Sequence, residues 1–158
     1  MMARVIWLVP FVLLLACDRN RVYEENTDLP NHAWPADTVP QFTFAIADAD
    51  IGYNIYLNLR NGIDYPHRNI YVQYVLSDSL RQPLEKELRN FQLFHPKTGY
   101  PFGSGSGGVY AHEFDLLVDY HFPQPGRYSI SLAQFMRYEA LPEIYSVGVR
   151  IEKAAAGE

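Results

Sequence analysis

The pattern of apolar and polar side chains divides the chain into three parts: a short apolar segment, a polar segment and a long alternating region. From residue 41 onward, apolar residues recur at every second position in several short runs. A period of two is typical of β-strands with one buried face. The alternation predicts strands over residues 41–46, 53–60, 70–76, 109–119, 128–136 and 145–151.

Residues 84–94 allow two interpretations. Leu84, Leu88 and Phe91 stand at helical spacing, whereas residues 88–94 suit a strand equally well. We favour the strand, because the strands on either side need a pairing partner. About seven short antiparallel strands separated by turn residues predict an all-β fold. We expect one β-sandwich, immunoglobulin-like or jelly-roll-like, over residues 41–153, followed by a disordered tail over residues 154–158.

The N-terminal apolar segment has the form of a signal peptide. Arg4 precedes an apolar run over residues 5–15, which is about half the roughly 20 residues that a membrane-spanning helix needs. The sequence Leu-Leu-Ala-Cys at residues 14–17 resembles the lipobox of bacterial lipoproteins. This resemblance implies cleavage between Ala16 and Cys17 and attachment of lipid to Cys17. Two or three acyl chains hold a domain stably at a membrane, so we expect an anchored protein.

Composition limits the nature of the mature chain. Cys17 is the only cysteine, so lipidation leaves neither a disulfide nor a free thiol. The 142 residues after the signal peptide suit one domain, and loss of Arg4 changes the formal charge from −5 to −6. Residues 17–40 are polar and rich in asparagine and proline, so they predict an extended tether. The basic residues are scattered, which argues against a nucleic-acid partner.

No motif predicts catalysis, a metal or a cofactor. Gly103, Gly105 and Gly108 match the dinucleotide-binding spacing, but a strand is expected after them where that motif requires a helix. They predict a flexible or tightly bent loop. The segment 48–52 lacks the later oxygen ligands of a calcium loop and predicts a turn. The five histidines show no metal-ligand spacing, and no serine has a paired base. Carboxylate pairs that meet only in space stay possible.

A set of short motifs runs through the alternating region in a fixed order. The motifs are Phe42-x-Phe44-x-Ile46, Tyr53-Asn54-Ile55, Leu59-Arg60-Asn61, Tyr65-Pro66, Asn69, Thr98-Gly99, Gly103 to Gly107, Gln134-x-Met136-Arg137, Leu141 and Val147 to Glu152. Their order and spacing resemble the GldH family of gliding-motility lipoproteins from the Bacteroidetes. Membership implies a lipid-anchored envelope protein, at the outer membrane, that serves gliding machinery tied to type IX secretion. The family has no known catalytic residues, so the implied role is structural or assembly-related, with other envelope proteins as partners.

Exposed polar residues in these motifs are candidates for a partner surface. They form two expected clusters, one around the loop after residue 60 and one at the ends of the last two strands. These residues are Arg60, Asn61 and Asn69, and Gln134, Arg137, Arg150 and Glu152. A second interpretation is that Arg60, Arg137 and Glu152 merely pair across strands, which contributes little when exposed.

Two further questions stay open at this point. A β-sandwich lipoprotein could instead bind surface glycans, with tyrosines such as Tyr71 and Tyr100 stacking on sugar rings. The sequence also leaves open which face of the membrane carries the protein, because Asp18 beside the lipidated cysteine is a retention signal only in some bacteria.

Overall fold

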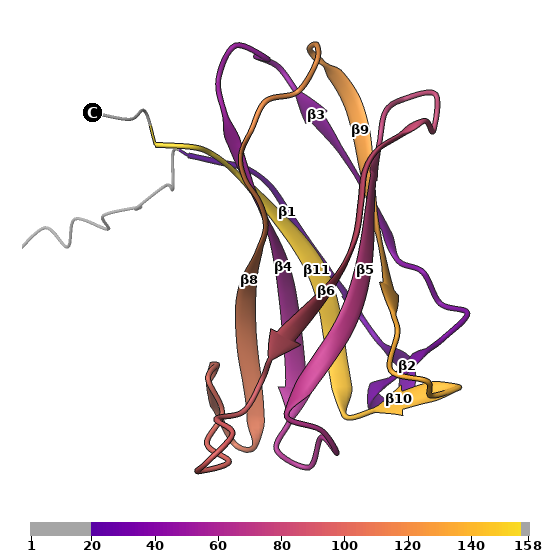
Figure 1. The fold of residues 1–158 in the computed structure, drawn as a ribbon, viewed down its shortest axis with the longest axis vertical. Helices are drawn as coiled ribbons and strands as arrows, with labels where there is room; N and C mark the ends of the chain where they lie inside the picture. Colours follow the sequence, from indigo (N-terminus) through magenta and orange to yellow (C-terminus); the bar gives the residue numbers. More distant parts are fainter. Residues whose placement is uncertain (1–19, 156–158) are drawn as a thin grey trace, which may run out of the picture.

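The computed structural model describes residues 20–155, so the signal peptide, Ala16, Cys17 and the last three residues lie outside it. Two antiparallel sheets pack face to face (Figure 1). The prediction of an all-β sandwich is confirmed, and within the described chain the only helical element is the 3-10 turn Pro30–His32. No helix in residues 20–155 is long and apolar enough to cross a membrane.

The sheets draw their strands from distant parts of the chain. The five-stranded sheet has the order β1 (Arg21–Asp28), β11 (Ile144–Lys153), β4 (Tyr53–Gly62), β8 (Val109–Tyr120) and β7 (Ser104–Ser106). The four-stranded sheet has the order β3 (Gln41–Ile46), β9 (Gly126–Gln134), β5 (Asn69–Ser77) and β6 (Pro83–Gln92). A small ribbon pairs β10 (Ala140–Pro142) with β2 (Ala33–Pro35).

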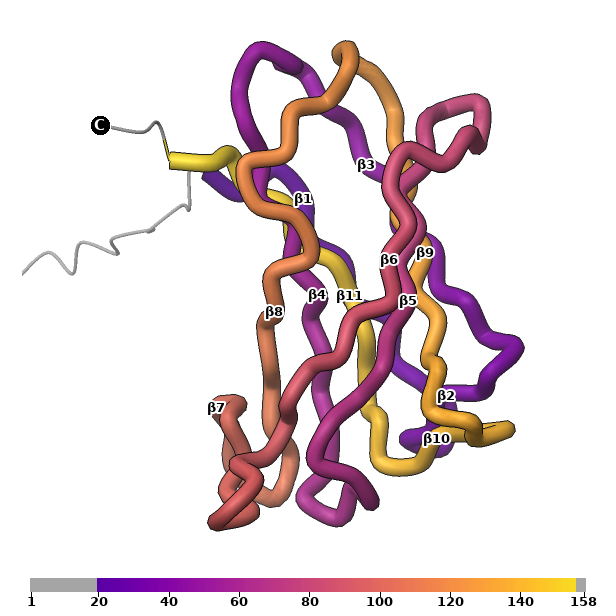
Figure 2. The backbone as a smooth tube through the Cα atoms, in the orientation of Figure 1, coloured from indigo at the N-terminus to yellow at the C-terminus, as the bar shows by residue number. Residues whose placement is uncertain are grey.

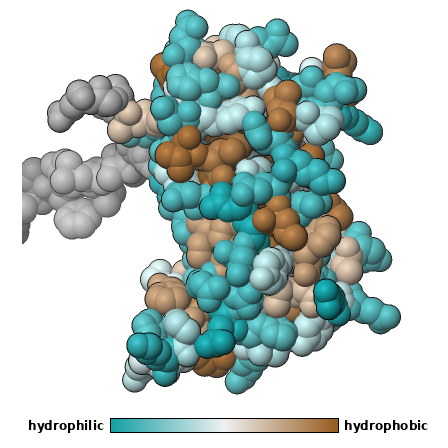
Figure 3. Space-filling view, viewed as in Figure 1, coloured by the Kyte–Doolittle hydropathy of each residue, from teal (hydrophilic) through white to brown (hydrophobic). Residues whose placement is uncertain are grey.

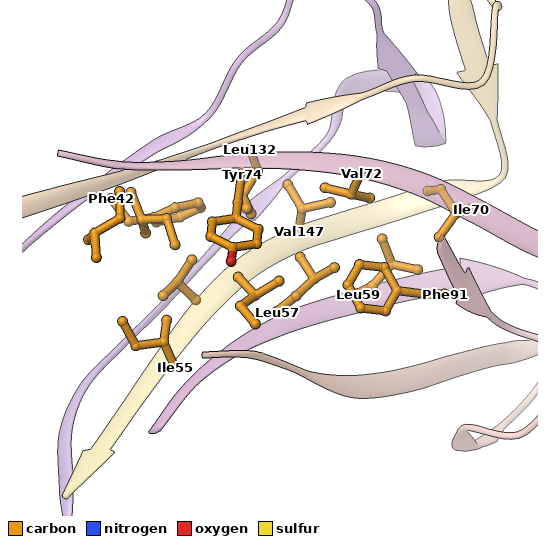
Figure 4. Packing of buried hydrophobic residues seen from close by; sticks show 14 of the residues in the cluster. Phe42, Ile55, Leu57, Leu59, Ile70, Val72, Tyr74, Phe91, Leu132 and Val147 are labelled. Atoms are coloured by element: carbon orange, nitrogen blue, oxygen red, sulfur yellow. The ribbon is translucent and has the colours of Figure 1, made fainter. Parts of the chain in front are cut away.

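The alternating side chains fill the space between the sheets. Figure 4 shows Ile55, Leu57 and Leu59 of β4 pointing toward Val72 and Tyr74 of β5. All five are essentially inaccessible to solvent. Full burial of one such side chain contributes about 1.5–3 kcal/mol, so this double row dominates the stability of the sandwich.

The segment with two interpretations is a strand. β6 pairs with β5 from Ser77↔Pro83 to Asn69↔Gln92, so the helical alternative is wrong. Strand geometry sends Phe91 into the core and Leu88 to the outer face. Pairing with β5 outweighs the helical spacing, because it satisfies the backbone donors and acceptors over the whole segment.

A tether was expected over residues 17–40, but from residue 21 onward this segment is part of the folded domain. β1 pairs with β11 from Arg21↔Glu152 to Asp28↔Ser146 and forms an edge of the five-stranded sheet. Farther on, Trp34 is 0% exposed and its Nε1 donates a hydrogen bond to the Thr38 carbonyl at 2.9 Å. Backbone pairing, not an apolar face, holds β1 in place, which is why the hydrophobic pattern gives no signal for it.

The glycine-rich segment was expected to be either a flexible or a tightly bent loop, and it is tightly bent. Ser104–Ser106 pairs with Val109, Tyr110 and Ala111, and Gly107 and Gly108 make the turn with φ of 66° and 83°. Two successive positive φ angles are the geometry of a type I′ hairpin turn, which favours glycine.

Both ends of the described chain lie at the same end of the sandwich (Figure 2). The start of β1 and the end of β11 are cross-strand neighbours there, as are Lys153 and Tyr53. The end of β9 and the start of β5 therefore lie toward the opposite end, together with the β2–β10 ribbon.

Candidate functional site

A groove of about 980 Å³ lies over the outer face of the four-stranded sheet. Its floor is set by the strand register, which places outward side chains in rows. One row joins Lys86, Val75 and Ser131, and the next joins Leu88, Gln73 and Ala133. The segment before β3 and the turn after β9 form its walls, so residues from four separate stretches of chain converge on it.

Large apolar side chains of this groove are open to solvent. Val39 is 50% exposed, Leu88 47%, Phe135 49% and Tyr71 39%. On the face drawn in Figure 3, apolar side chains form separate patches within a mainly hydrophilic surface. Contiguous exposed apolar surface is a mark of ligand or protein binding sites. The four residues therefore make this groove the first candidate for a functional site.

The turn after β9 is held rigidly against β5. Gln134 is only 5% exposed; its Nε2 donates to the Tyr138 carbonyl at 2.9 Å, and its Oε1 accepts from the Met136 amide at 2.8 Å. The Phe135 amide donates to the Tyr71 carbonyl at 2.8 Å. Gln134 thus closes the turn at both ends. Gln134 was expected on an exposed surface, but it is buried and its amide is engaged within the protein.

A second set of contacts ties the groove wall to the loop before β5. The Tyr138 hydroxyl lies 2.9 Å from His67 Nε2. In the same loop Tyr65 donates to the Asn69 carbonyl at 3.0 Å, and burial raises the pKa of its hydroxyl. Asn69 in turn donates its side-chain amide to Asn90 Oδ1 at 2.7 Å. These contacts explain why Asn69 belongs to the structural support of this end of the sheet.

Arg137 is the one charged residue in the groove lining. It is exposed in the turn after β9 and has a φ of 60°, a left-handed conformation that is costly for a residue other than glycine. Farther along the same sheet face, Arg81 and Arg127 border a second, smaller depression of about 440 Å³. The carboxylate there, Asp78, accepts hydrogen bonds from the amides of its own turn.

The outer face of the five-stranded sheet has the opposite character. Arg150 forms an ion pair with Glu152, and its NH1 lies 3.6 Å from Glu113 Oε2. Burial raises the pKa of the Glu113 carboxyl, and the positive charge of Arg150 opposes that shift. Nearby, Asn58 donates to Glu24 Oε1 at 3.1 Å. This face is a network of internally paired charges in which carboxylates predominate.

The seven candidate surface residues do not form one surface. Gln134 ends β9 of the four-stranded sheet and Arg137 lies in the turn after it. Arg150 and Glu152 lie on the five-stranded sheet, because the chain crosses between sheets after β9. Arg60 also lies on the five-stranded sheet, where it pairs with Ser146 and Ala111. Asn61 is 0% exposed and cannot contact a partner. Glu152 instead forms an ion pair with Arg150 of its own strand, and no ion pair among residues 20–155 joins Arg60 or Arg137 to Glu152.

The sequence contains apolar residues at outward strand positions that mark the groove, but the same residues also fit the pattern of a buried strand. Tyr71 and Val75 stand at the outward positions of an alternating strand, where polar residues are expected. Leu88 occupies the matching position on β6. Apolar residues on both faces of a strand make the outward face a candidate contact surface.

The remaining candidate motifs form local structure. The Asp50 amide donates to Asp48 Oδ1 at 2.9 Å, which closes the expected turn. In the part of the chain that the structure describes, no three histidine, cysteine or acidic side chains gather as a metal site would require. Tyr100 is exposed in the segment between β6 and β7 and is separate from the groove lining, whereas Tyr71 is part of it.

Comparison with known proteins agrees with the motif pattern. The gliding-motility lipoprotein GldH of Flavobacterium johnsoniae is 28% identical over 155 residues, and a GldH homolog of Christiangramia forsetii is 27% identical over 164 residues. Each alignment covers 94% of both chains. Among solved structures, a carbohydrate-binding module specific for non-crystalline cellulose superposes with a TM-score of 0.45 at 10% identity, over 84% of this chain and 73% of the module.

The family comparison covers both sheets of the sandwich. The family model described as GldH lipoprotein matches residues 21–151, from the start of β1 to the end of β11. The matched region includes the groove and the charged outer face of the five-stranded sheet. The chain therefore belongs to the GldH lipoprotein family.

Proposed function

We propose that this protein is a non-enzymatic lipoprotein of the cell envelope that supports assembly of gliding machinery linked to type IX secretion. The observation that carries the proposal is the family match over residues 21–151, together with relatives named as gliding-motility lipoproteins. The groove and the charged outer face of the five-stranded sheet suit binding better than catalysis. The protein is a docking component held at the outer membrane.

The anchor in this proposal is Cys17, lipidated after cleavage behind Ala16. Four residue steps separate Cys17 from Arg21, where β1 begins. A fully extended chain spans at most about 3.6 Å per residue, so this spacer reaches no farther than about 14 Å. The sandwich therefore sits close to the membrane surface, with the start of β1 nearest the lipid.

Replacement of Cys17 by alanine tests the proposal. In cells that carry only the Cys17→Ala variant, we expect loss of acyl mass, loss of the protein from the outer-membrane fraction and impaired gliding and type IX secretion. Ala16→Gly keeps a small residue before the cleavage site and serves as the matched control. Gliding and secretion that persist in cells without the gene would refute the role, and a mature N-terminus at Cys17 without acyl mass would refute the anchor.

A glycan-binding function is the second candidate, favoured by the position of Tyr71 in the groove. The exposed ring of Tyr71 can stack on a sugar, and the side-chain amide of the neighbouring Gln73 can form hydrogen bonds with the sugar hydroxyls. Titration with soluble cello-oligosaccharides and with a panel of bacterial surface glycans tests it. Binding that is lost in Tyr71→Ala and retained in Tyr100→Ala would support this function, and absence of binding across the panel would exclude it.

A further inference from the structure

The turn that walls the groove on the four-stranded sheet is held in place by hydrogen bonds. Hydrogen bonds from Gln134 close the turn after β9, and the Phe135 amide binds the β5 backbone at Tyr71. The same turn holds Arg137 at a positive φ. A site whose walls are held by hydrogen bonds loses little conformational entropy on binding.

The exposed apolar side chains are concentrated there. Four of the ten large apolar residues that are exposed in residues 20–155 line this one groove. Val75 and Met136 add aliphatic and thioether surface to the lining. Met side chains adapt their shape to the group they contact, which suits a site for apolar side chains of a partner.

The one charged side chain in the groove lining is positive. Arg137 belongs to the lining, Lys86 follows Val75 in the same row, and no lining residue carries a carboxylate. Among the acidic residues next to lining residues in sequence, Glu87 accepts a hydrogen bond from the core residue Tyr74 at 3.1 Å, and Asp37 and Glu139 are not part of the lining. In a chain of net charge −5, this face is therefore complementary to negative charge.

We propose that this groove docks an acidic, apolar segment of a partner protein. Aliphatic side chains such as Val75 and Leu88 favour apolar residues over sugar hydroxyls, and the amide of Gln134 is already engaged within the turn. Carboxylates of the segment pair with Arg137 and Lys86, while its apolar side chains cover Phe135 and Leu88. The inference rests on the proposed docking function and names its surface and the chemistry of its partner.

Site-specific photo-crosslinking in native cells tests the proposal with the full lipidated chain. Benzoylphenylalanine replaces Phe135 or Leu88 in the groove and, as a control, Val118, which is 66% exposed on β8 of the other sheet. We expect ultraviolet light to yield a protein adduct from the groove positions and none from Val118. Mass spectrometry of the adduct should identify a segment with net negative charge and several apolar residues.

Charge variants then connect the adduct to the groove. A synthetic peptide with the captured sequence should bind the double variant Lys86→Gln/Arg137→Asn at least tenfold more weakly than the parent protein. Asparagine tolerates a positive φ, so the exchange removes charge without new backbone strain. Binding to the parent should weaken with salt more steeply than binding to the variant. Arg60→Gln, on the other sheet, is the matched control and should bind as the parent does.

Other outcomes overturn the proposal. These are an adduct with a basic or wholly polar segment, an adduct with a glycan or lipid in place of protein, or no adduct from either groove position. Gliding and secretion are scored in the same strains. An acidic, apolar adduct in cells whose gliding does not depend on the gene would refute the proposed function and keep the groove assignment. Loss of gliding in cells without the gene, together with no adduct from the groove positions, would refute the groove assignment and keep the proposed function.

Discussion

His112 makes the stability of this domain sensitive to mildly acidic pH. The side chain points inward from β8 opposite Leu59, is 7% exposed, and stacks on Phe114 at a centroid distance of 5.5 Å. Its Nε2 has no hydrogen-bond partner within the described chain. Burial lowers the pKa of this imidazole from 6.5 to about 4, because the charged form would lose its hydration there.

The sign of the effect is set by which state of the protein binds the proton. Between pH 6.5 and 4 the unfolded chain takes up a proton at His112 that the folded protein does not. The contribution to stability is therefore complete above pH 6.5 and is lost as the pH falls toward 4. A difference of two and a half pKa units corresponds to about 3 kcal/mol at full effect, and to about 2 kcal/mol at pH 5.

The assay is urea unfolding of the unlipidated chain from residue 18, at pH 5 and pH 7.5. We expect His112→Phe, which retains an aromatic ring beside Phe114, to lose about 2 kcal/mol less of its unfolding free energy across this interval than the parent. His121→Phe is the matched control, because His121 is exposed beside Asp119. Parallel pH profiles for the parent and His112→Phe would refute the reasoning. Equal flattening in His121→Phe would refute the assignment to His112.

Three further predictions concern packing and the groove wall, each measured by chemical unfolding. Trp34→Ala should lose about 3–5 kcal/mol, because it empties a fully buried site in a segment whose sequence suggests a tether. Gly148→Ala should lose about 1–3 kcal/mol, since a Cβ there overlaps the β1 backbone, whereas Gly126→Ala, with no atom closer than 4.0 Å, should be neutral or slightly stabilised. Gln134→Ala should lose about 1–3 kcal/mol and speed hydrogen exchange at the Met136 amide; unchanged exchange would mean that Gln134 does not hold the turn.

The sequence predicts the strands whose apolar residues face the core and misses those held by other means. β4 and β5 show a clear alternation because one face of each is buried. In β1 only Tyr23 is partly buried, and the strand is held by backbone hydrogen bonds to β11. Such pairing depends on a partner more than a hundred residues away, which local patterns do not encode. β2 and β10 are too short for a period to be recognised.

The functional surface is predicted less well, because it depends on which sheet each strand joins. Arg137 follows β9 and Arg150 lies within β11, the next long strand, yet the crossing after β9 puts these two strands in different sheets. Polarity alone also misjudges exposure. Asn61 and Gln134 are polar but buried, and their side-chain amides donate hydrogen bonds to backbone carbonyls. Conversely, most residues that line the groove floor and walls are apolar, so polarity alone assigns them to the core. A search for apolar residues at outward strand positions would have found Tyr71, Val75 and Leu88.

The short spacer and the position of the groove together constrain how the protein acts at a membrane. If Cys17 carries the lipid, the end of the sandwich with Arg21 and Lys153 lies within about 14 Å of it. β4 has ten residues, so the opposite end of the strands lies about 33 Å farther along. The groove begins at that far end, between the start of β5 and the turn after β9. In the proposed arrangement, the lipid-proximal end and the start of the groove thus lie at opposite ends of the sandwich, and the proposed partner reaches the groove without displacing the membrane. Under the proposal, the length of the sandwich then sets the height at which that partner is held.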